Sequence, residues 1–427
     1  MKLKTSGFSD SESVADASIV MLSRIATSPN IVEPEHVSML KLRNFYAAAL
    51  TAIALTACSG GDLQSVNADK LFTQTNETDN AVLMFTRNRN GTLSQSVRVP
   101  TGGHGTNGVS YFMGGEVAPD SLASNHSVIV APDRNQLFVV NSGDASVSVF
   151  ALDPATHAPR LLRVSPTGGQ LPTSLAYRSG VLYVTHQTGE QQLRAYRVEN
   201  DGRLTQIGAY TLVQANALPT SVTVSRDGSS VVVNVPLAGP AGAQLNSIVS
   251  FRVLADGRLG VPSTTASQSP VPFGGAFAHG NLGNVYASAD ASGAFNTYAL
   301  TQSSLQGLGG PVVSGRAAAC WLSITPDNRY VFVGNGDGTV SSFALDASGR
   351  AILLNAVAAQ EPPVNGAATS LAGDSWVSPD GKFLYQGYLG ADKVVVYSIQ
   401  GDGSLKKVDE QVAGTSSGVS LQGMAGI

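Results

Sequence analysis

The chain has 427 residues, of which 43% are hydrophobic and 13% are charged, and this composition excludes a disordered protein. The net charge of −4 gives no field that would attract a phosphate backbone, so nucleic acid is excluded as an expected partner. Few charged residues also disfavour long exposed helices, whereas the 46 glycines suit short strands and tight turns, so an all-β fold is predicted.

The N-terminal region contains one strongly apolar run. Residues 1–38 show no helical or strand periodicity, and the run extends from Phe45 to Ala57 after the basic residues Lys41 and Arg43. It is too short to span a bilayer but has the length of a signal-peptide core. Because a signal peptide begins a chain, translation is expected to start at Met39. Residues 1–38 are then either an extension ahead of the true start or a disordered leader.

A lipidation motif ends this segment. Leu55-Thr56-Ala57-Cys58 resembles the bacterial lipobox, in which the cysteine thiol receives a diacylglyceryl group before cleavage. Ser59 follows in place of the aspartate typical of inner-membrane retention, so the resemblance implies a lipid anchor in the outer membrane, facing the periplasm. Residues 39–58 are predicted to be a signal peptide and 59–65 a linker; the alternative is a buried helix with an incidental cysteine. Cys320 is expected to be buried and unreactive, without a disulfide partner.

Seven repeats follow the linker. Each contains a strand of alternating apolar residues that ends in an aromatic residue, usually ahead of a glycine-containing turn. The spacing of these aromatic residues is near the period of a four-stranded propeller blade. From the second copy on, two apolar strands joined by a turn such as Pro379-Asp380-Gly381 precede the aromatic strand and are predicted to be the inner strands. The seven aromatic residues are Phe85, Phe150, Tyr196, Phe251, Tyr298, Phe343 and Tyr397.

The two ends of the repeat region complement each other. The first copy lacks its innermost strand, and residues 420–427 provide a leftover strand at the C-terminus. If this strand completes blade one, the ring closes and no edge is left open. Residues 66–427 are therefore predicted to form one domain, a seven-bladed β-propeller with four antiparallel strands per blade, and to be a monomer.

Three long connections are expected on one face of the disc, opposite the short Asp-Gly turns. They are Thr101–Asn125, Val235–Asn246 and Ala356–Asp374. Long loops gathered on one face of a rigid scaffold indicate a functional surface. The alternative is that these positions merely tolerate insertions.

The blade pattern of Ser378–Tyr385 and Leu389–Tyr397 resembles the lactonase family of seven-bladed propellers, which includes bacterial 6-phosphogluconolactonase and fungal carboxymuconate-lactonising enzymes. The resemblance covers the whole mature chain and implies hydrolysis of a sugar-type lactone. The family's site uses a His, an Arg and a Glu on the fourth and fifth blades. The matching positions here fall near Thr220, Gly274 and Asp290, so only a carboxylate is kept.

Other residues are candidates for a rebuilt site. Opening a lactone requires a base for water and a donor for the developing oxyanion. The first hypothesis takes Asp290 as the base, with Arg316 or a histidine such as His126 as the oxyanion partner. It predicts that Asp290→Asn abolishes turnover and leaves the fold intact. Ligand contacts are expected from His104, His186 and Asp374.

Each candidate also has a structural interpretation. His126 and His186 fit as strand-end caps, Asp290 as a turn aspartate, and His104 and Arg316 as solvated loop residues. The second hypothesis is a non-catalytic propeller of the cell envelope that binds a small molecule, such as a lactone or sugar, or an envelope protein. No motif predicts a cofactor, and no histidine pairs have metal-ligand spacing. Asparagines that follow second strands fit as turn caps or, alternatively, as a polar ring for metal or sugar: Asn76, Asn141, Asn234 and Asn335.

Overall fold

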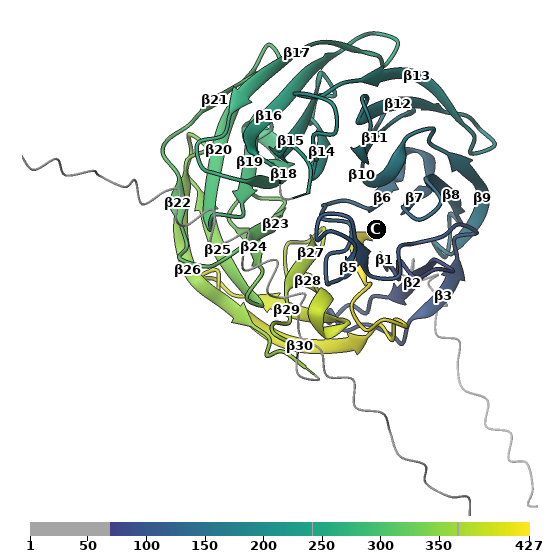
Figure 1. Ribbon diagram of the computed structural model, residues 1–427. Helices are drawn as coiled ribbons and strands as arrows, with labels where there is room; N and C mark the ends of the chain where they lie inside the picture. The colour runs from purple at the N-terminus through teal and green to yellow at the C-terminus, as the bar shows by residue number, and fades with distance from the viewer. Residues whose placement is uncertain (1–68, 241, 365–366) are drawn as a thin grey trace, which may run out of the picture.

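The computed structural model describes residues 69–240, 242–364 and 367–427 (Figure 1). Seven antiparallel sheets surround a central axis, which confirms the predicted all-β, seven-bladed propeller. The predicted signal peptide, the predicted lipidation site Cys58 and the predicted linker lie outside the described residues. Within the described ranges, no helix has the length and apolar character needed to cross a bilayer.

The blades have the following strands, from the axis outward. Blade 1 comprises β31 (Gln422–Gly426), β1 (Lys70–Gln74), β2 (Ala81–Thr86) and β3 (Val97–Pro100). Blade 2 comprises β6 (Val128–Ala131), β7 (Gln136–Asn141), β8 (Ser146–Leu152) and β9 (Pro159–Pro166). Blade 3 comprises β10 (Gln170–Arg178), β11 (Val181–Thr188), β12 (Leu193–Val198) and β13 (Leu204–Tyr210). Blades 4 and 5 comprise β14 (Ser221–Val224), β15 (Ser230–Leu237), β16 (Gln244–Val253) and β17 (Leu259–Ala266); and β18 (Pro272–Phe277), β19 (Val285–Asp290), β20 (Ala294–Thr301) and β21 (Ser304–Gly307), with β22 (Val312–Val313) also paired to β20. Blades 6 and 7 comprise β23 (Ala319–Ile324), β24 (Val331–Asn335), β25 (Thr339–Leu345) and β26 (Ala351–Gln360); and β27 (Ala372–Val377), β28 (Phe383–Tyr388), β29 (Lys393–Ile399) and β30 (Leu405–Val412). A short hairpin, β4 (Val109–Ser110) with β5 (Glu116–Val117), and 3-10 turns at 132–134, 280–282 and 389–391 complete the described elements.

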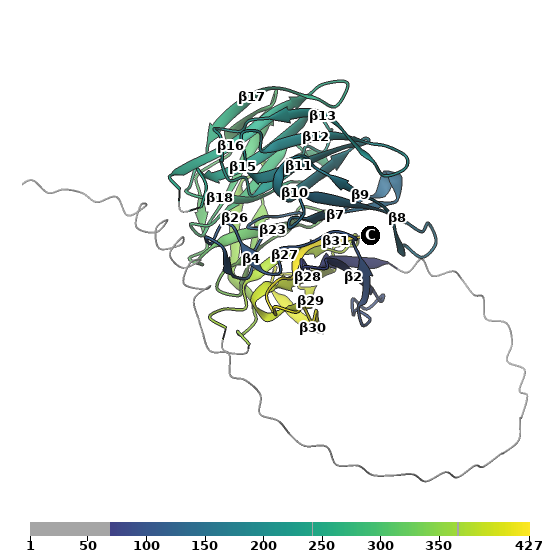
Figure 2. The same cartoon turned by 45° about the vertical axis from the view of Figure 1, so that its right-hand side comes forward.

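Both ends of the repeat region build blade 1. Strand β31 pairs antiparallel with β1, with Leu71 opposite Gly426, and the Ile427 N–H donates to the Lys70 carbonyl at 3.0 Å. Figure 2 shows the yellow C-terminal strand beside the purple blade 1. The predicted ring closure is confirmed, and it removes the open edge that β1 would otherwise present.

The recurring aromatic residues hold the blades together. All seven, from Phe85 to Tyr397, are at most 2% exposed. Burying such a side chain contributes about 1.5–3 kcal/mol relative to leaving it in water. The tyrosines also satisfy their hydroxyls, as when Tyr196 donates to the Thr167 carbonyl at 2.5 Å. The sequence period therefore reflects one large buried side chain per blade.

One predicted loop is mostly strand. The expectation that Val235–Asn246 is a long loop is wrong, because β15 continues to Leu237 and β16 begins at Gln244. Leu237 is buried, and its carbonyl accepts the Leu218 N–H at 2.9 Å. Packing beyond the blade edge therefore extends the hairpin. The same effect carries β26 of blade 6 to Gln360, inside the third expected loop.

A buried ion cluster anchors the rest of that third connection to blade 7. Glu361 is 5% exposed, and its carboxylate lies 2.7 Å from the Lys393 ammonium and 2.9 Å from that of Lys407. Tyr397 also donates to Glu361 at 3.3 Å. Because a buried charge requires a partner, these contacts determine where the chain re-enters the ring.

We expect Glu361→Ala to destabilise the fold by about 3 kcal/mol, because it leaves the Lys393 ammonium buried with only the half-exposed Glu410 as a partner. The free energy of unfolding in urea measures this effect. Glu410→Ala is the matched control and is expected to cost less than about 1 kcal/mol, since an exposed ion pair contributes little. Equal losses in the two variants would contradict the assigned anchor.

Candidate functional site

A segment of the first long connection enters the space around the axis at the loop face. We call this space the central funnel and its loop-face end the head of the funnel. We call residues 118–125 the plug. The Asn125 N–H donates to the Thr220 carbonyl of blade 4 at 2.9 Å, and its side chain donates to the Cys320 carbonyl of blade 6 at 3.2 Å. The Trp321 indole N–H donates to the Ser124 carbonyl at 3.1 Å. The plug therefore crosses the axis from blade 1 toward the opposite blades, near the centre of Figure 1.

The plug packs against the two positions where the family's histidine and arginine are missing. A Cβ atom at Gly274 would lie 2.6 Å from the Asn125 Oδ1 and closer still to the Cys320 carbonyl. Thr220 is fully buried, and its hydroxyl donates to the Phe273 carbonyl at 2.7 Å. A side chain has no room at Gly274, which gives a packing reason for the missing arginine. Cys320 is buried, as predicted, and burial raises the pKa of its thiol.

Two carboxyl groups meet at the plug. Asp374 lies on β27, the innermost strand of blade 7, and Asp120 lies on the plug; they are 6% and 7% exposed. The Asp374 Oδ1 accepts the His126 N–H at 3.2 Å, whereas its Oδ2 has no hydrogen-bond partner among the described residues. The fold therefore brings together two predicted site residues, His126 and Asp374. It adds Asp120, which the sequence analysis missed because Pro119-Asp120 has the pattern of an ordinary turn.

Burial controls the protonation of this group. It raises the pKa of Asp374 to about 7 and raises the pKa of Asp120 well above its usual range, the latter also through the nearby Asp374 charge. Burial lowers the pKa of His126 to about 4, so this imidazole is neutral near pH 7. Neither aspartate forms an ion pair with a described residue. Together they form a buried carboxyl pair in which both pKa values are raised.

The raised pKa of Asp374 predicts a pH-dependent stability. An acid whose pKa is higher when folded binds extra protons between about pH 4 and pH 7, so the free energy of unfolding falls as pH rises through that window. Asp374→Asn keeps an oxygen for the His126 N–H and removes the titration. We expect it to be more stable than the wild type at pH 8, by up to about 4 kcal/mol, and not at pH 4. Urea unfolding at the two pH values measures this difference; an equal difference at both would contradict it.

Asp290 is enclosed by hydrogen-bond donors. It ends β19 and is fully buried. Its Oδ1 accepts the Ser288 hydroxyl at 2.6 Å, and its Oδ2 accepts Ser267, Ser269 and Asn296 at 3.0, 2.6 and 2.8 Å. Burial raises the pKa of this carboxyl to about 7. Unlike Asp374, it leaves neither oxygen without a partner.

The position of Asp290 recurs around the ring. Strand register places Asn141, His186 and Asn335 at the same point of the second strand in blades 2, 3 and 6. Asn141 and Asn335 donate to hydroxyls of the third strand, at 2.8 Å to Ser148 and 3.0 Å to Ser341. His186 is fully buried, its Nδ1 lies 3.2 Å from the Gln192 carbonyl, and burial lowers its pKa to about 4. These contacts favour the structural interpretations, a strand-end cap for His186 and a turn aspartate for Asp290.

The remaining predicted residues lie apart from the funnel. Arg316 follows a segment that joins the turn after Asp290, since the Ser314 N–H donates to the Gly293 carbonyl at 3.1 Å. Its guanidinium, however, pairs with Asp337 at 3.5 Å. His104 is exposed at the rim, with its Nδ1 2.7 Å from the Thr78 carbonyl. The six predicted residues therefore form no single site; only His126 and Asp374 meet at the axis.

The loop face has a cavity beside the plug, with a volume of about 480 Å³. The β4–β5 hairpin, the plug and the connections of blades 3 and 4 surround it. Its walls include Val109, Tyr111, Ser121, Leu171, Gln187 and Pro240.

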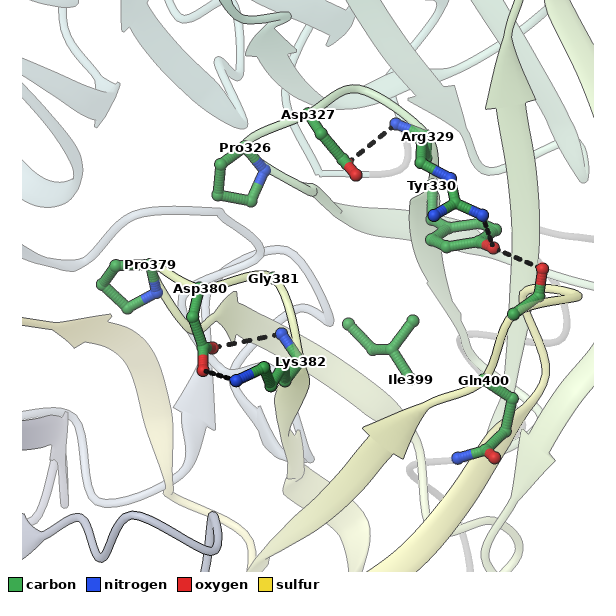
Figure 3. Close-up of a pocket in the computed structure, with 11 residues that line it drawn as sticks. Pro326, Asp327, Arg329, Tyr330, Pro379, Asp380, Gly381, Lys382, Ile399 and Gln400 are labelled. Atoms are coloured by element: carbon green, nitrogen blue, oxygen red, sulfur yellow. Dashed lines mark hydrogen bonds and ion pairs between the residues drawn. The ribbon is translucent and has the colours of Figure 1, made fainter.

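The opposite face has grooves of a different origin. Figure 3 shows the one between blades 6 and 7, with a volume of about 490 Å³. Asp327 accepts the Arg329 N–H at 3.1 Å, and Asp380 pairs with Lys382 at 3.4 Å, so these charges already serve their own turns. Similar grooves lie between blades 3 and 4 and between blades 4 and 5. Because a similar groove recurs between neighbouring blades, it follows from the blade repeat and does not mark a specific site. We therefore place the candidate site on the loop face.

No three His, Cys, Asp or Glu residues in the described part of the chain are grouped so that they could hold a metal ion.

Comparisons with known proteins agree with the architecture. The family described as a lactonase, 7-bladed beta-propeller, matches residues 65–218 and 246–419. Among solved structures, the Pseudomonas aeruginosa periplasmic gluconolactonase is 18% identical, with a TM-score of 0.62 over 84% of this chain and 99% of its own. A Bacteroides uniformis protein, assigned provisionally as a 6-phosphogluconolactonase, is 16% identical, with a TM-score of 0.62 over 84% of this chain and 100% of its own. No curated protein matches the sequence. The chain belongs to the lactonase family of seven-bladed β-propellers.

Proposed function

We propose that this protein hydrolyses a lactone at the head of the funnel, with Asp374 as the general base. One observation carries the proposal: Asp374 has an unpartnered Oδ2, while the His126 N–H holds its Oδ1. Burial raises its pKa to about 7, close to the value at which a general base works best near neutral pH. Membership of the lactonase family supports the reaction class.

The carboxyl pair supplies both proton transfers of the reaction. Ionised Asp374 takes a proton from water through Oδ2, and the water oxygen attacks the lactone carbonyl carbon. Asp120, whose pKa burial and the nearby Asp374 raise, acts as the general acid and donates a proton to the ring oxygen as the C–O bond breaks. The product is the hydroxy acid. Ser121, the residue after Asp120, lines the cavity beside the plug, which supports this cavity as the space for a substrate.

The hypothesis that Asp290 is the base stays a prediction. Four donors surround its carboxylate, and a water molecule would have to displace one of them. The Asp374 Oδ2 is buried and has no hydrogen-bond partner among the described residues, so no donor has to leave it, and this difference favours Asp374. Arg316 pairs with Asp337, which leaves the oxyanion role to groups at the plug.

A second candidate function is ligand binding without turnover. The plug packs against Thr220 and Gly274, where the family carries its histidine and arginine, and the cavity beside it remains available. On this alternative the protein is a binding module of the cell envelope, with a small molecule or an envelope protein as its partner.

We also propose that the protein acts in the bacterial envelope. The apolar run at 45–57 and the lipobox that ends in Cys58 support an outer-membrane lipid anchor that faces the periplasm. Strand β31 pairs with β1, so β1 presents no open edge to which a second copy of the chain could add a strand. This pairing supports a monomer.

Hydrolysis assays on the purified protein test the function. A panel of sugar and aromatic lactones near pH 7, followed by proton release, should show at least one hydrolysed above its spontaneous rate. Background rates across the whole panel would refute the hydrolase and leave the binding module.

A further inference from the structure

The cavity beside the plug has uncharged walls. Val109, Tyr111, Leu171 and Pro240 contribute apolar surface, and no described residue that lines it is an Asp, Glu, Lys, Arg or His. A volume of about 480 Å³ is within the range of small-molecule sites.

Two polar side chains of the cavity already have partners. The Gln187 amide donates to the Leu122 carbonyl of the plug, and the Ser121 hydroxyl accepts the Asn76 amide at 2.9 Å. Groups engaged in this way offer a ligand few new hydrogen bonds. The surface left for a ligand is therefore mostly hydrocarbon and aromatic ring.

One wall residue, Leu171, has an unfavourable backbone conformation, and glycines form the tip of the hairpin beside it. Leu171 has a φ of +52°, which is unfavourable for a side chain with a Cβ and persists only when the surrounding structure requires it. At the tip of the β4–β5 hairpin, Gly114 and Gly115 have φ of +72° and +94° and also line the cavity. A Cβ at either glycine would meet no atom within 4 Å, so the hairpin borders open space.

The charge of the walls decides between ligand classes. A phosphate group carries up to two negative charges, and burying it without a cation is strongly unfavourable. An aromatic ring instead gains free energy when it leaves water for such a surface.

We propose that this cavity binds an uncharged molecule with an apolar or aromatic ring, and that the substrate is therefore an aromatic lactone and not a phosphorylated sugar lactone. The statement about the substrate rests on the proposed hydrolase function. The binding does not depend on it.

Calorimetric titration of the purified protein with coumarin, an uncharged aromatic lactone that is stable near pH 7, tests the binding. We expect saturable binding of coumarin and none of 6-phosphogluconate at the same concentrations. Val109→Asp places a charge in the wall and should weaken coumarin binding at least tenfold. Val109 is 42% exposed, so the fold should tolerate this change.

Val117→Asp is the matched control. Val117 lies opposite Val109 in the same hairpin, is 50% exposed and does not line the cavity. It should leave coumarin affinity within about twofold of the wild type. Equal losses in the two variants, tighter binding of 6-phosphogluconate, or no coumarin binding would overturn the proposal.

Turnover separates this inference from the proposed function. Dihydrocoumarin hydrolysis is measured on the wild type and on Asp374→Asn. If the wild type binds coumarin but hydrolyses no dihydrocoumarin, the proposed cavity ligand would stand and the proposed hydrolase function would be refuted. If the wild type does not bind coumarin and Val109→Asp leaves turnover unchanged, the hydrolase proposal would stand and the proposed cavity ligand would be refuted.

Discussion

Asp374→Asn is expected to lower lactone turnover by a factor of about 10² to 10⁴, the usual contribution of a general base. Asparagine keeps an oxygen for the His126 N–H but cannot take a proton from water. The measurement is kcat on the best substrate of the lactone panel, with circular dichroism to confirm the fold. Asp120→Asn should also lose activity, and the double variant should lose little more, because the two groups act as a unit.

Asp290→Asn is the control that separates the two assignments. Asp290 accepts four hydrogen bonds, and both of its oxygens have donors. Under the proposed function, its replacement is expected to change turnover by less than about tenfold. The opposite result, with activity lost in Asp290→Asn and kept in Asp374→Asn, would establish Asp290 as the base and refute the carboxyl pair.

The pH profile gives a further readout of the same assignment. Activity of the wild type should rise as pH increases through about 7, since Asp374 acts in its ionised form. It should fall again where Asp120 loses its proton, which gives a bell-shaped profile whose apparent pKa values belong to the pair. A profile that is flat between pH 5 and 9 would contradict a carboxyl base.

Deletion of residues 420–427 is expected to abolish the folded state. This segment supplies β31, and it buries Leu421 and Met424 in the core around the axis. Its removal exposes the backbone edge of β1 and opens a cavity in blade 1. The combined loss exceeds about 5 kcal/mol, comparable with the whole stability of many domains. Gel filtration and circular dichroism should show aggregated or unfolded protein.

A permutant provides the control for this deletion. The Ile427 N–H donates to the Lys70 carbonyl at 3.0 Å, so a short turn can join residues 420–427 directly ahead of Lys70. This chain keeps every strand and places β31 before β1, and it should recover the native circular dichroism spectrum and elution volume. A truncated chain that folds as well as the permutant would show that closure by β31 is dispensable.

Local patterns in the sequence were sufficient to predict the blades. Each blade is built from residues close in the chain: two inner strands, a turn such as Pro379-Asp380-Gly381, and a third strand that ends in a buried aromatic residue. Period-2 alternation and turn chemistry act over a few residues, so they can be read without tertiary information. Closure was also predictable, because only the first repeat lacked a strand that the C-terminus supplied.

The same local reasoning failed where packing beyond a blade decides the structure. Val235–Asn246 had the composition of a loop, yet Leu237 is buried against Leu218 and the hairpin extends. Asp290 was singled out because it matches the position of the family's glutamate. The register instead places it with Asn141 and Asn335, whose amides donate to hydroxyls of their own third strands.

The sequence by itself determined the fold class, the blade count, the ring closure and the absence of the family's histidine and arginine. Only the tertiary structure decided what occupies that space. The plug reaches Thr220 and Cys320, and Asp120 meets Asp374, only after the closed ring has brought distant segments to one axis. Such contacts have no local signal, because the burial that raises a carboxyl pKa depends on every blade being in place.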